Sequence, residues 1–169
     1  MRVAMERSDL IRSWAMDIAG CLAPDYVWHD MAQVWQTPGA GEESVAGLAS
    51  LPVTDRASMF ESLGVTPPIA HALAEANDET MGRCILALYR SATQPAMARL
   101  GESLGAAAVR PGLVIIPTDD QYTRGEARAR WSAGQAKAEV AVLPGLGHWW
   151  MVQDPAAGAA ALTKFWSSL

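Results

Sequence analysis

Several residue patterns that would mark other classes of protein are missing from this sequence. It has only two cysteines, Cys21 and Cys84, which lie far apart and lack CxxC spacing, so a disulfide framework or a thiolate metal site is not expected. Its three histidines also lack the spacing of metal ligands. We therefore expect two reduced thiols and propose neither a metal nor another cofactor.

Basic clusters and long apolar runs are missing as well. The net charge is −5 and the Lys and Arg residues are scattered, whereas a face that binds nucleic acid needs a basic excess. No apolar run approaches the ~20 residues of a membrane span, and the N-terminus lacks the apolar stretch of a signal peptide. The expected protein is soluble and cytoplasmic, with no nucleic-acid or membrane partner.

The composition that remains suits one globular domain, because half of the residues are apolar and 18% are charged. Residues 1–92 predict helices joined by loops, without a confident strand. The expected helices cover residues 7–21, 25–36, 54–63, a segment starting at Thr66-Pro67, and 78–91, with Thr54, Thr66 and Asn77 as caps. The first of them rests on apolar residues at helical spacing, namely Leu10, Ile11, Trp14, Ile18 and Leu22.

From about residue 95 the pattern changes to alternating strands and helices. After a helix over 95–104, residues 113–117 form a continuous apolar run, which is typical of a strand buried on both faces of a parallel sheet. Thr123 and Glu126 form a possible capping box for a helix reaching residue 136, and residues 140–143 form the next strand. Asp154 and Pro155 then open a last helix that ends near Trp166.

The predicted fold class is therefore α/β, with a βαβα unit whose crossover is right-handed. Two parallel strands do not make a stable sheet alone. Because the first half is expected to be all-helical, the further strands would come from another chain or from a longer polypeptide. We accordingly expect this chain by itself to be marginally stable or self-associating.

Two chemically active residue types follow the two predicted strands. The acidic pair Asp119-Asp120 comes after the first strand, and His148 lies in the glycine-bracketed loop Gly145-Leu-Gly-His148 after the second. The carboxyl ends of neighbouring parallel strands meet at one edge of a sheet, so an acid and a histidine there supply two members of a nucleophile–His–acid triad. Structural roles, as a turn acid and a solvent-facing loop histidine, remain the alternatives.

These residues resemble the C-terminal part of the α/β-hydrolase fold family. The segment Pro117-Thr-Asp-Asp120 resembles the turn that carries the family's acid, with proline in place of glycine, and Gly145-Leu-Gly-His148 resembles its histidine loop. The resemblance assigns the acid to Asp120, 28 residues before the histidine, with Asp119 as the rival. It also implies that residues 1–92 form a helical cap and residues 93–169 the C-terminal part of the core.

The nucleophile that this family carries on a G-x-S-x-G turn is not found. The literal match, Gly101-Glu-Ser-Leu-Gly105, follows a predicted helix rather than a strand, and Ser103 lies only 17 residues before Asp120. We expect Ser103 to be an ordinary residue at a helix end. The chain then begins after the nucleophile half of a larger hydrolase, through a late start codon, a truncated gene or a split enzyme.

Aromatic residues indicate the substrate. The resemblance implies that the cap covers the active site, so the tryptophans near the N-terminus and beside His148 are candidates for the pocket wall: Trp14, Trp28, Trp35 and Trp149. They favour a small apolar substrate with an ester, lactone, amide or similar bond. Two hypotheses stay open: a hydrolase fragment whose partner is a missing N-terminal half or a second copy, and a catalytically inactive remnant or oligomerising module.

Overall fold

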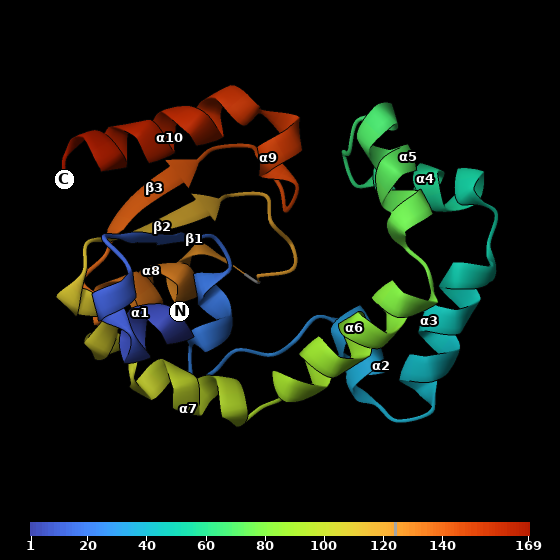
Figure 1. Cartoon of the computed structure of the whole chain (residues 1–169), viewed down its shortest axis with the longest axis horizontal. Coiled ribbons are helices and arrows are strands. Elements are labelled where there is room, and N and C mark those ends of the chain that lie inside the picture. Colours follow the sequence, from blue (N-terminus) through green and yellow to red (C-terminus); the bar gives the residue numbers. More distant parts are fainter. Residues whose placement is uncertain (124) are drawn as a thin grey trace. The chain divides into compact units, whose positions relative to one another are not determined.

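The computed structural model describes residues 1–123 and 125–169, which form two compact units (Figure 1). One unit combines Met1–Val27 with Gln94–Leu169, and the other is Trp28–Thr93. The division near residue 92 expected from the sequence lies beside the second boundary, whereas the first 27 residues group with the C-terminal part. That the helical unit acts as a cap stays a prediction.

A parallel sheet organises the first unit. Its strands among the described residues are β1 (Trp14–Met16), β2 (Gly112–Pro117) and β3 (Glu139–Leu143), in the order β1-β2-β3. Trp14 lies opposite Gly112, and Leu113 lies opposite Glu139. The structure thus confirms an α/β fold with the predicted β2–helix–β3–helix order.

Strand β1 corrects the expectation that the first half contains no strand. The predicted helix over residues 7–21 is wrong. In its place the chain forms short 3₁₀ turns on either side of β1, η1 (Ser8–Leu10) and η2 (Ala19–Leu22). The indole of Trp14 packs against Gly112 of β2, where a Cβ would come within 2.1 Å of it. The backbone pairing with β2 therefore outweighs the helical spacing of the apolar residues, and the first half does supply a sheet neighbour.

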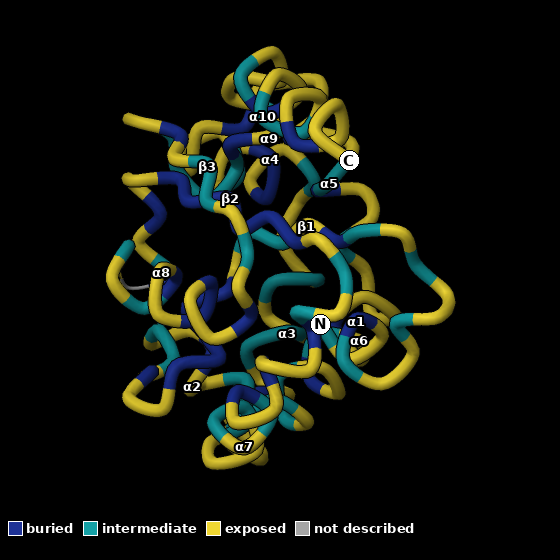
Figure 2. The backbone as a smooth tube through the Cα atoms, turned by 90° about the vertical axis from the view of Figure 1, so that its left-hand side faces the viewer, coloured by how far each residue is buried: buried dark blue, intermediate teal, exposed yellow. Residues whose placement is uncertain are grey.

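The sheet is covered on both faces, as its apolar central strand predicts. All six residues of β2 are buried (Figure 2). Leu113 and Ile115 pack with Trp150 and Phe165 on the side of α9 (Trp150–Gln153) and α10 (Pro155–Ser167). Side chains alternate along a strand, and α8 (Glu126–Gln135) packs against the opposite face (Figure 1).

Helix termini in this unit follow the sequence in part. Asp154 caps α10 by accepting from the N–H of Ala157 at 3.0 Å, as expected. The capping box proposed for α8 is wrong, since its N-cap is Gly125 and no side chain caps it. The remaining elements of the unit are α1 (Arg2–Glu6), α7 (Ala96–Glu102) and the 3₁₀ segment η3 (Leu104–Val109).

The second unit is entirely helical over its described residues. It contains α2 (Asp30–Gln36), α3 (Ala40–Ser50), α4 (Val53–Ser62), α5 (Pro67–Ala76) and α6 (Glu79–Ser91). Thr66 precedes α5 with proline in the first turn, as predicted. Two caps differ: Asp78, not Asn77, accepts from the first turn of α6, and α4 begins after Pro52 instead of at Thr54. The helix expected from residue 25 starts only at Asp30.

A buried arginine joins the helices of this unit. The guanidinium of Arg56 donates to the carbonyl of Ala74 at 3.0 Å and to that of Ala49 at 2.9 Å. It thereby binds carbonyls in the last turns of α5 and α3, where the regular hydrogen bonding of a helix ends. None of the helices in the described part of the chain combines the length and the apolar character needed to cross a bilayer.

Candidate active site

Two loops at the carboxyl end of the sheet form the candidate site. Besides the contact between Asp120 and His148, three hydrogen bonds join the loop after β2 to the end of β3 and the loop that follows it. The N–H of Thr118 donates to the carbonyl of Leu143 at 3.2 Å, and the N–H of Asp119 donates to the carbonyl of Leu146 at 2.9 Å. The N–H of Gly145 donates to Oγ1 of Thr118 at 2.8 Å. These bonds fix the acid loop relative to the histidine loop, so the two functional side chains do not depend on each other alone for their positions.

The backbone of the histidine loop is held at both of its glycines. Gly145 has a φ of +72°, in the left-handed region where a side chain would be strained. Gly147 donates its N–H to Oε1 of Gln153 at 2.8 Å, so a side chain from α9 holds the residue that precedes His148. Gln153 is a positioning residue that the sequence pattern did not single out.

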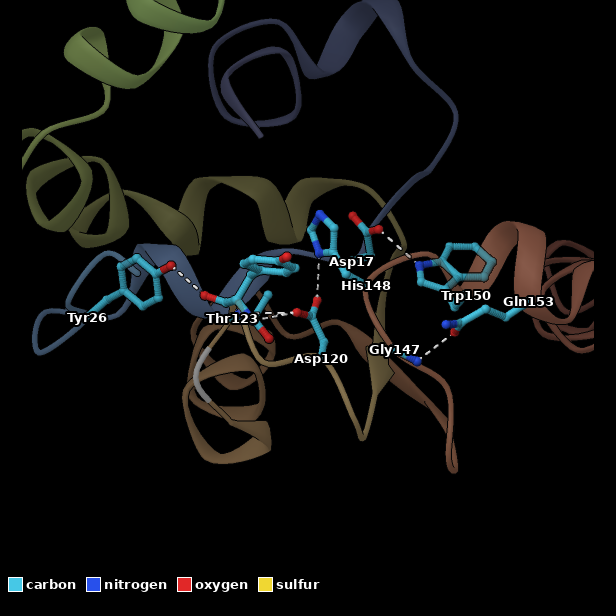
Figure 3. Close-up of polar contacts among 9 residues, drawn as sticks. Asp17, Tyr26, Asp120, Thr123, Gly147, His148, Trp150 and Gln153 are labelled. Carbon is cyan, nitrogen blue, oxygen red and sulfur yellow. Dashed lines mark hydrogen bonds and ion pairs between the residues drawn. The ribbon is translucent and has the colours of Figure 1, made fainter. Parts of the chain in front are cut away.

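Asp120 and His148 meet as the sequence predicted. Oδ2 of Asp120 lies 3.0 Å from Nδ1 of His148 (Figure 3). The other carboxylate oxygen accepts from the N–H groups of Tyr122 at 2.8 Å and Thr123 at 3.3 Å. The side chain of Asp120 is only 4% exposed and that of His148 is 31% exposed. The acid is thus buried and fully bonded, while the imidazole reaches solvent.

The rival acid has a different role. Asp119 is exposed, and its carboxylate accepts from the hydroxyl of Thr118 at 2.9 Å. Its backbone holds the histidine loop, but its side chain stays within its own turn. The spacing argument that preferred Asp120 therefore agrees with the geometry.

The pair perturbs the titration of both groups. Burial by itself would raise the pKa of Asp120, but the hydrogen bond and charge of His148, together with the two backbone N–H donors, lower it below its usual range. The hydrogen bond to Asp120 raises the pKa of His148, burial opposes this, and the charges of Asp120 and Asp17 raise it further. An ionised acid beside a basic imidazole is the arrangement that general-base chemistry requires.

Two aromatic rings flank the imidazole. The ring of Tyr122 contacts His148 edge-on at 4.8 Å between centroids, and that of Trp149 does so at 5.8 Å. The hydroxyl of Tyr26 donates to the carbonyl of Tyr122 at 2.9 Å and anchors its loop. Trp149 was a sequence candidate for the pocket wall. Tyr122 was missed, although its place two residues after the acid was a usable signal.

The other predicted pocket residues belong to the sheet core and to the helical unit. Trp14 is a core residue of β1, 9% exposed, with its indole N–H donating to the carbonyl of Ala107 at 3.2 Å, which corrects its assignment to the pocket. Trp28 and Trp35 belong to the helical unit, where their rings lie 5.4 and 4.7 Å from that of Tyr89. Their contribution to a pocket stays a prediction.

One further carboxylate at this end of the sheet was missed. Asp17 directly follows β1, and its Oδ2 accepts from the indole N–H of Trp150 at 3.0 Å (Figure 3). No residue pattern pointed to Asp17, because the strand that it follows was predicted as helix.

Neither a nucleophile nor a metal site completes the pair among residues 1–123 and 125–169. Ser103 is an exposed residue between α7 and η3, with φ of −93° and ψ of 3°, and a helix rather than a strand directly precedes it. It therefore lacks the strand-to-helix elbow that activates a serine in this kind of site. Within the same residues, no three histidine, cysteine or carboxylate side chains gather closely enough to hold a metal ion.

The whole fold is similar to that of two solved hydrolases. A variant of the meta-cleavage product hydrolase CumD matches 98% of this chain and 59% of its own, with a TM-score of 0.64 and 13% identity. An E-2-(acetamidomethylene)succinate hydrolase matches 97% of this chain and 60% of its own, with a TM-score of 0.64 and 15% identity. No family model matches the sequence, and no curated protein does.

These likenesses confirm the α/β-hydrolase fold that the sequence indicated. The chain spans about 60% of the length of either hydrolase, and at this identity the likeness establishes the fold alone.

Proposed function

We propose that this chain supplies the acid and the base of a hydrolase that cleaves an ester, lactone, amide or similar bond in a small apolar substrate. The observation that carries the proposal is the 3.0 Å contact between Oδ2 of Asp120 and Nδ1 of His148 at the carboxyl end of a parallel sheet. The hydrolase fold of the two structural neighbours supports the same reaction class.

In the proposed mechanism, each nitrogen of the imidazole has its own role. An ionised Asp120 accepts the Nδ1–H of His148, which leaves the lone pair on Nε2 free to take a proton from a nucleophile. When that proton arrives, the carboxylate stabilises the imidazolium, and the two backbone N–H donors keep the carboxylate in place. His148 is then the general base, and it returns the proton to the leaving group.

The nucleophile and the oxyanion donors belong, in this proposal, to a segment outside these 169 residues. Among the described residues, no hydroxyl or thiol hydrogen-bonds to the imidazole of His148, and the two structural neighbours are considerably longer than this chain. Among the described residues β1 is an outer strand of the sheet, paired with β2 on one side, and the proposal places a further parallel strand on its other side. A strand–turn–helix segment added there would bring a nucleophile to the carboxyl end of the sheet, where His148 lies.

The surroundings of the imidazole support the proposed substrate class. The rings of Tyr122 and Trp149 stand edge-on beside His148 and supply apolar surface at the site. In the proposed enzyme the unit Trp28–Thr93 is the cap, and Trp28 and Trp35 are its candidate contacts with substrate. The expected substrate is small, with an apolar group beside the bond that is cleaved.

The test begins with the coding DNA ahead of Met1. We expect a strand–turn–helix segment with a serine, cysteine or aspartate at the turn, on the same reading frame or on a neighbouring one. The extended protein, or the two chains together, should hydrolyse a short-chain p-nitrophenyl ester. His148→Ala should abolish this turnover, and Ser103→Ala is the matched control that should leave it unchanged.

Two outcomes would overturn the proposal. One is the absence of any such segment in every frame, combined with a defined oligomer of this chain by light scattering and no turnover that depends on His148. That result would favour the catalytically inactive, self-associating module. The other is loss of turnover in Ser103→Ala, which would assign the nucleophile to this chain.

A further inference from the structure

The three parallel strands each end in a titratable residue at the same edge of the sheet. Met16, the last residue of β1, lies opposite Val114 of β2, and Asp17 follows it directly. Asp120 follows β2 and His148 follows β3. Because parallel strands deliver the residues beyond their carboxyl ends to one edge, the chain carries a second carboxylate beside the Asp120–His148 pair.

A buried tryptophan fixes this second carboxylate. The indole N–H of Trp150 donates to Oδ2 of Asp17 at 3.0 Å, and Trp150 is only two residues beyond His148. The indole is 9% exposed and packs against Gly158, where a Cβ would come within 2.3 Å of the ring. A buried indole N–H needs an acceptor, so the packing of α9 on α10 determines where the carboxylate of Asp17 lies.

We propose that Asp17 is a positioning residue of this site: a second carboxylate, held by Trp150, that stabilises the protonated imidazole of His148. It acts through charge, because the hydrogen-bond partner of the imidazole is Asp120. A carboxylate near a partly buried imidazole acts through a medium of lower dielectric than water, where its charge is less screened. Its negative charge raises the pKa of His148, in the same direction as the charge of Asp120.

The remaining groups around the imidazole do not account for this effect. Tyr122 contacts the ring of His148 edge-on, and its backbone N–H binds Asp120. Asp119 keeps its carboxylate on the hydroxyl of its neighbour Thr118. Asp120 and Asp17 are therefore the two anionic groups that bias the imidazole toward its protonated form (Figure 3).

The catalytic meaning of this arrangement rests on the proposed function. If His148 takes the proton of a nucleophile, the imidazolium forms between two carboxylates that come from two different strands. Asp17 then lowers the energy of that state without touching the substrate. In the resting protein, the effect of Asp17 is a change in the pKa of His148, which can be measured without turnover.

The experiment is an NMR titration of the His148 imidazole in the 169-residue chain, with His148→Gln used to assign its resonance. Asp17→Asn removes the charge, preserves the side-chain volume and leaves an amide oxygen to accept from Trp150. Glu102→Gln is the matched control, because it removes one exposed carboxylate from α7 of the same unit. We expect the titration midpoint of His148 to fall in Asp17→Asn and to stay at the wild-type value in Glu102→Gln.

Trp150→Phe provides a second route, since it keeps an aromatic ring in the core, although a smaller one, and removes the donor to Asp17. Its His148 midpoint should also fall, by less than in Asp17→Asn, because the carboxylate remains but is no longer fixed. This variant decides the matter if Asp17→Asn does not fold. Equal midpoints in wild type, Asp17→Asn and Trp150→Phe would overturn the inference.

The same titration separates this inference from the proposed function. A lowered midpoint in a protein without esterase activity would leave the role of Asp17 in place and count only against the reaction. Esterase turnover that depends on His148, with an unchanged midpoint in Asp17→Asn, would support the proposed reaction and count against the role of Asp17.

Discussion

Removing the charge of Asp120 should reveal how much the Asp120–His148 pair stabilises the fold. The carboxylate makes three hydrogen bonds, to Nδ1 of His148 and to the N–H groups of Tyr122 and Thr123. Asp120→Asn keeps an oxygen for the two backbone donors and loses the bond to the charged imidazole. Because His148 is 31% exposed, we place the loss at the low end of the range for a hydrogen bond to a charged group, about 1.5 kcal/mol.

Asp120→Ala should cost more, because it also leaves two backbone N–H groups without an acceptor in a buried position. The expected loss is about 3 kcal/mol or more. Asp119→Asn is the control, since its exposed carboxylate bonds only to the neighbouring Thr118 hydroxyl, and it should change the free energy of unfolding by less than about 0.5 kcal/mol.

The pH dependence gives the sign of each contribution. The folded pKa of His148 is raised above 6.5, so its contribution is complete below pH 6.5 and is lost as the pH rises through the folded pKa. The folded pKa of Asp120 is lowered below 3.8, so its contribution is complete above pH 3.8 and is lost as the pH falls through the folded pKa. The difference between wild type and Asp120→Asn should therefore be largest between pH 3.8 and 6.5 and smaller at pH 9.

Urea unfolding followed by tryptophan fluorescence at pH 5.5 and pH 9 measures these differences. The reasoning fails if Asp119→Asn costs as much as Asp120→Asn, or if the cost of Asp120→Asn is the same at both pH values. Either result would mean that the ion pair contributes nothing specific to the folded state.

Two further predictions follow from the packing. Gly158→Ala should destabilise the protein by about 1–3 kcal/mol through overpacking against Trp150, whereas Gly134→Ala, with open space around its Cβ, should stabilise α8 by about 0.5–1 kcal/mol, both read as urea midpoints. Burial raises the pKa of the Cys21 thiol to about 11, while Cys84 is exposed. A disulfide reagent at pH 8 should accordingly modify Cys84 alone in the native protein and both thiols in urea, and fast native labelling of Cys21 would contradict the packing around it.

The acid–base pair could be predicted because its determinants are local. A continuous apolar run over residues 113–117 predicts a strand with both faces covered, whatever covers them. The loop that follows each strand then places Asp120 and His148 at a shared edge, since parallel strands leave no other arrangement. Asp154-Pro155 likewise fixes the start of α10 through a side-chain cap and a restricted φ, both of which act within one turn of helix.

Strand β1 and Asp17 could not be predicted in this way, because their determinants lie far away in the sequence. Three residues are too few for a strand pattern, and the apolar residues around Trp14 also fit a helix. The strand is favoured over the helix by its backbone hydrogen bonds to β2 and by the space above Gly112 that the indole fills. Local patterns thus determined the acid, the base and the elements that carry them. Only tertiary pairing decided which distant segment completes the sheet, and with it where a second carboxylate lies.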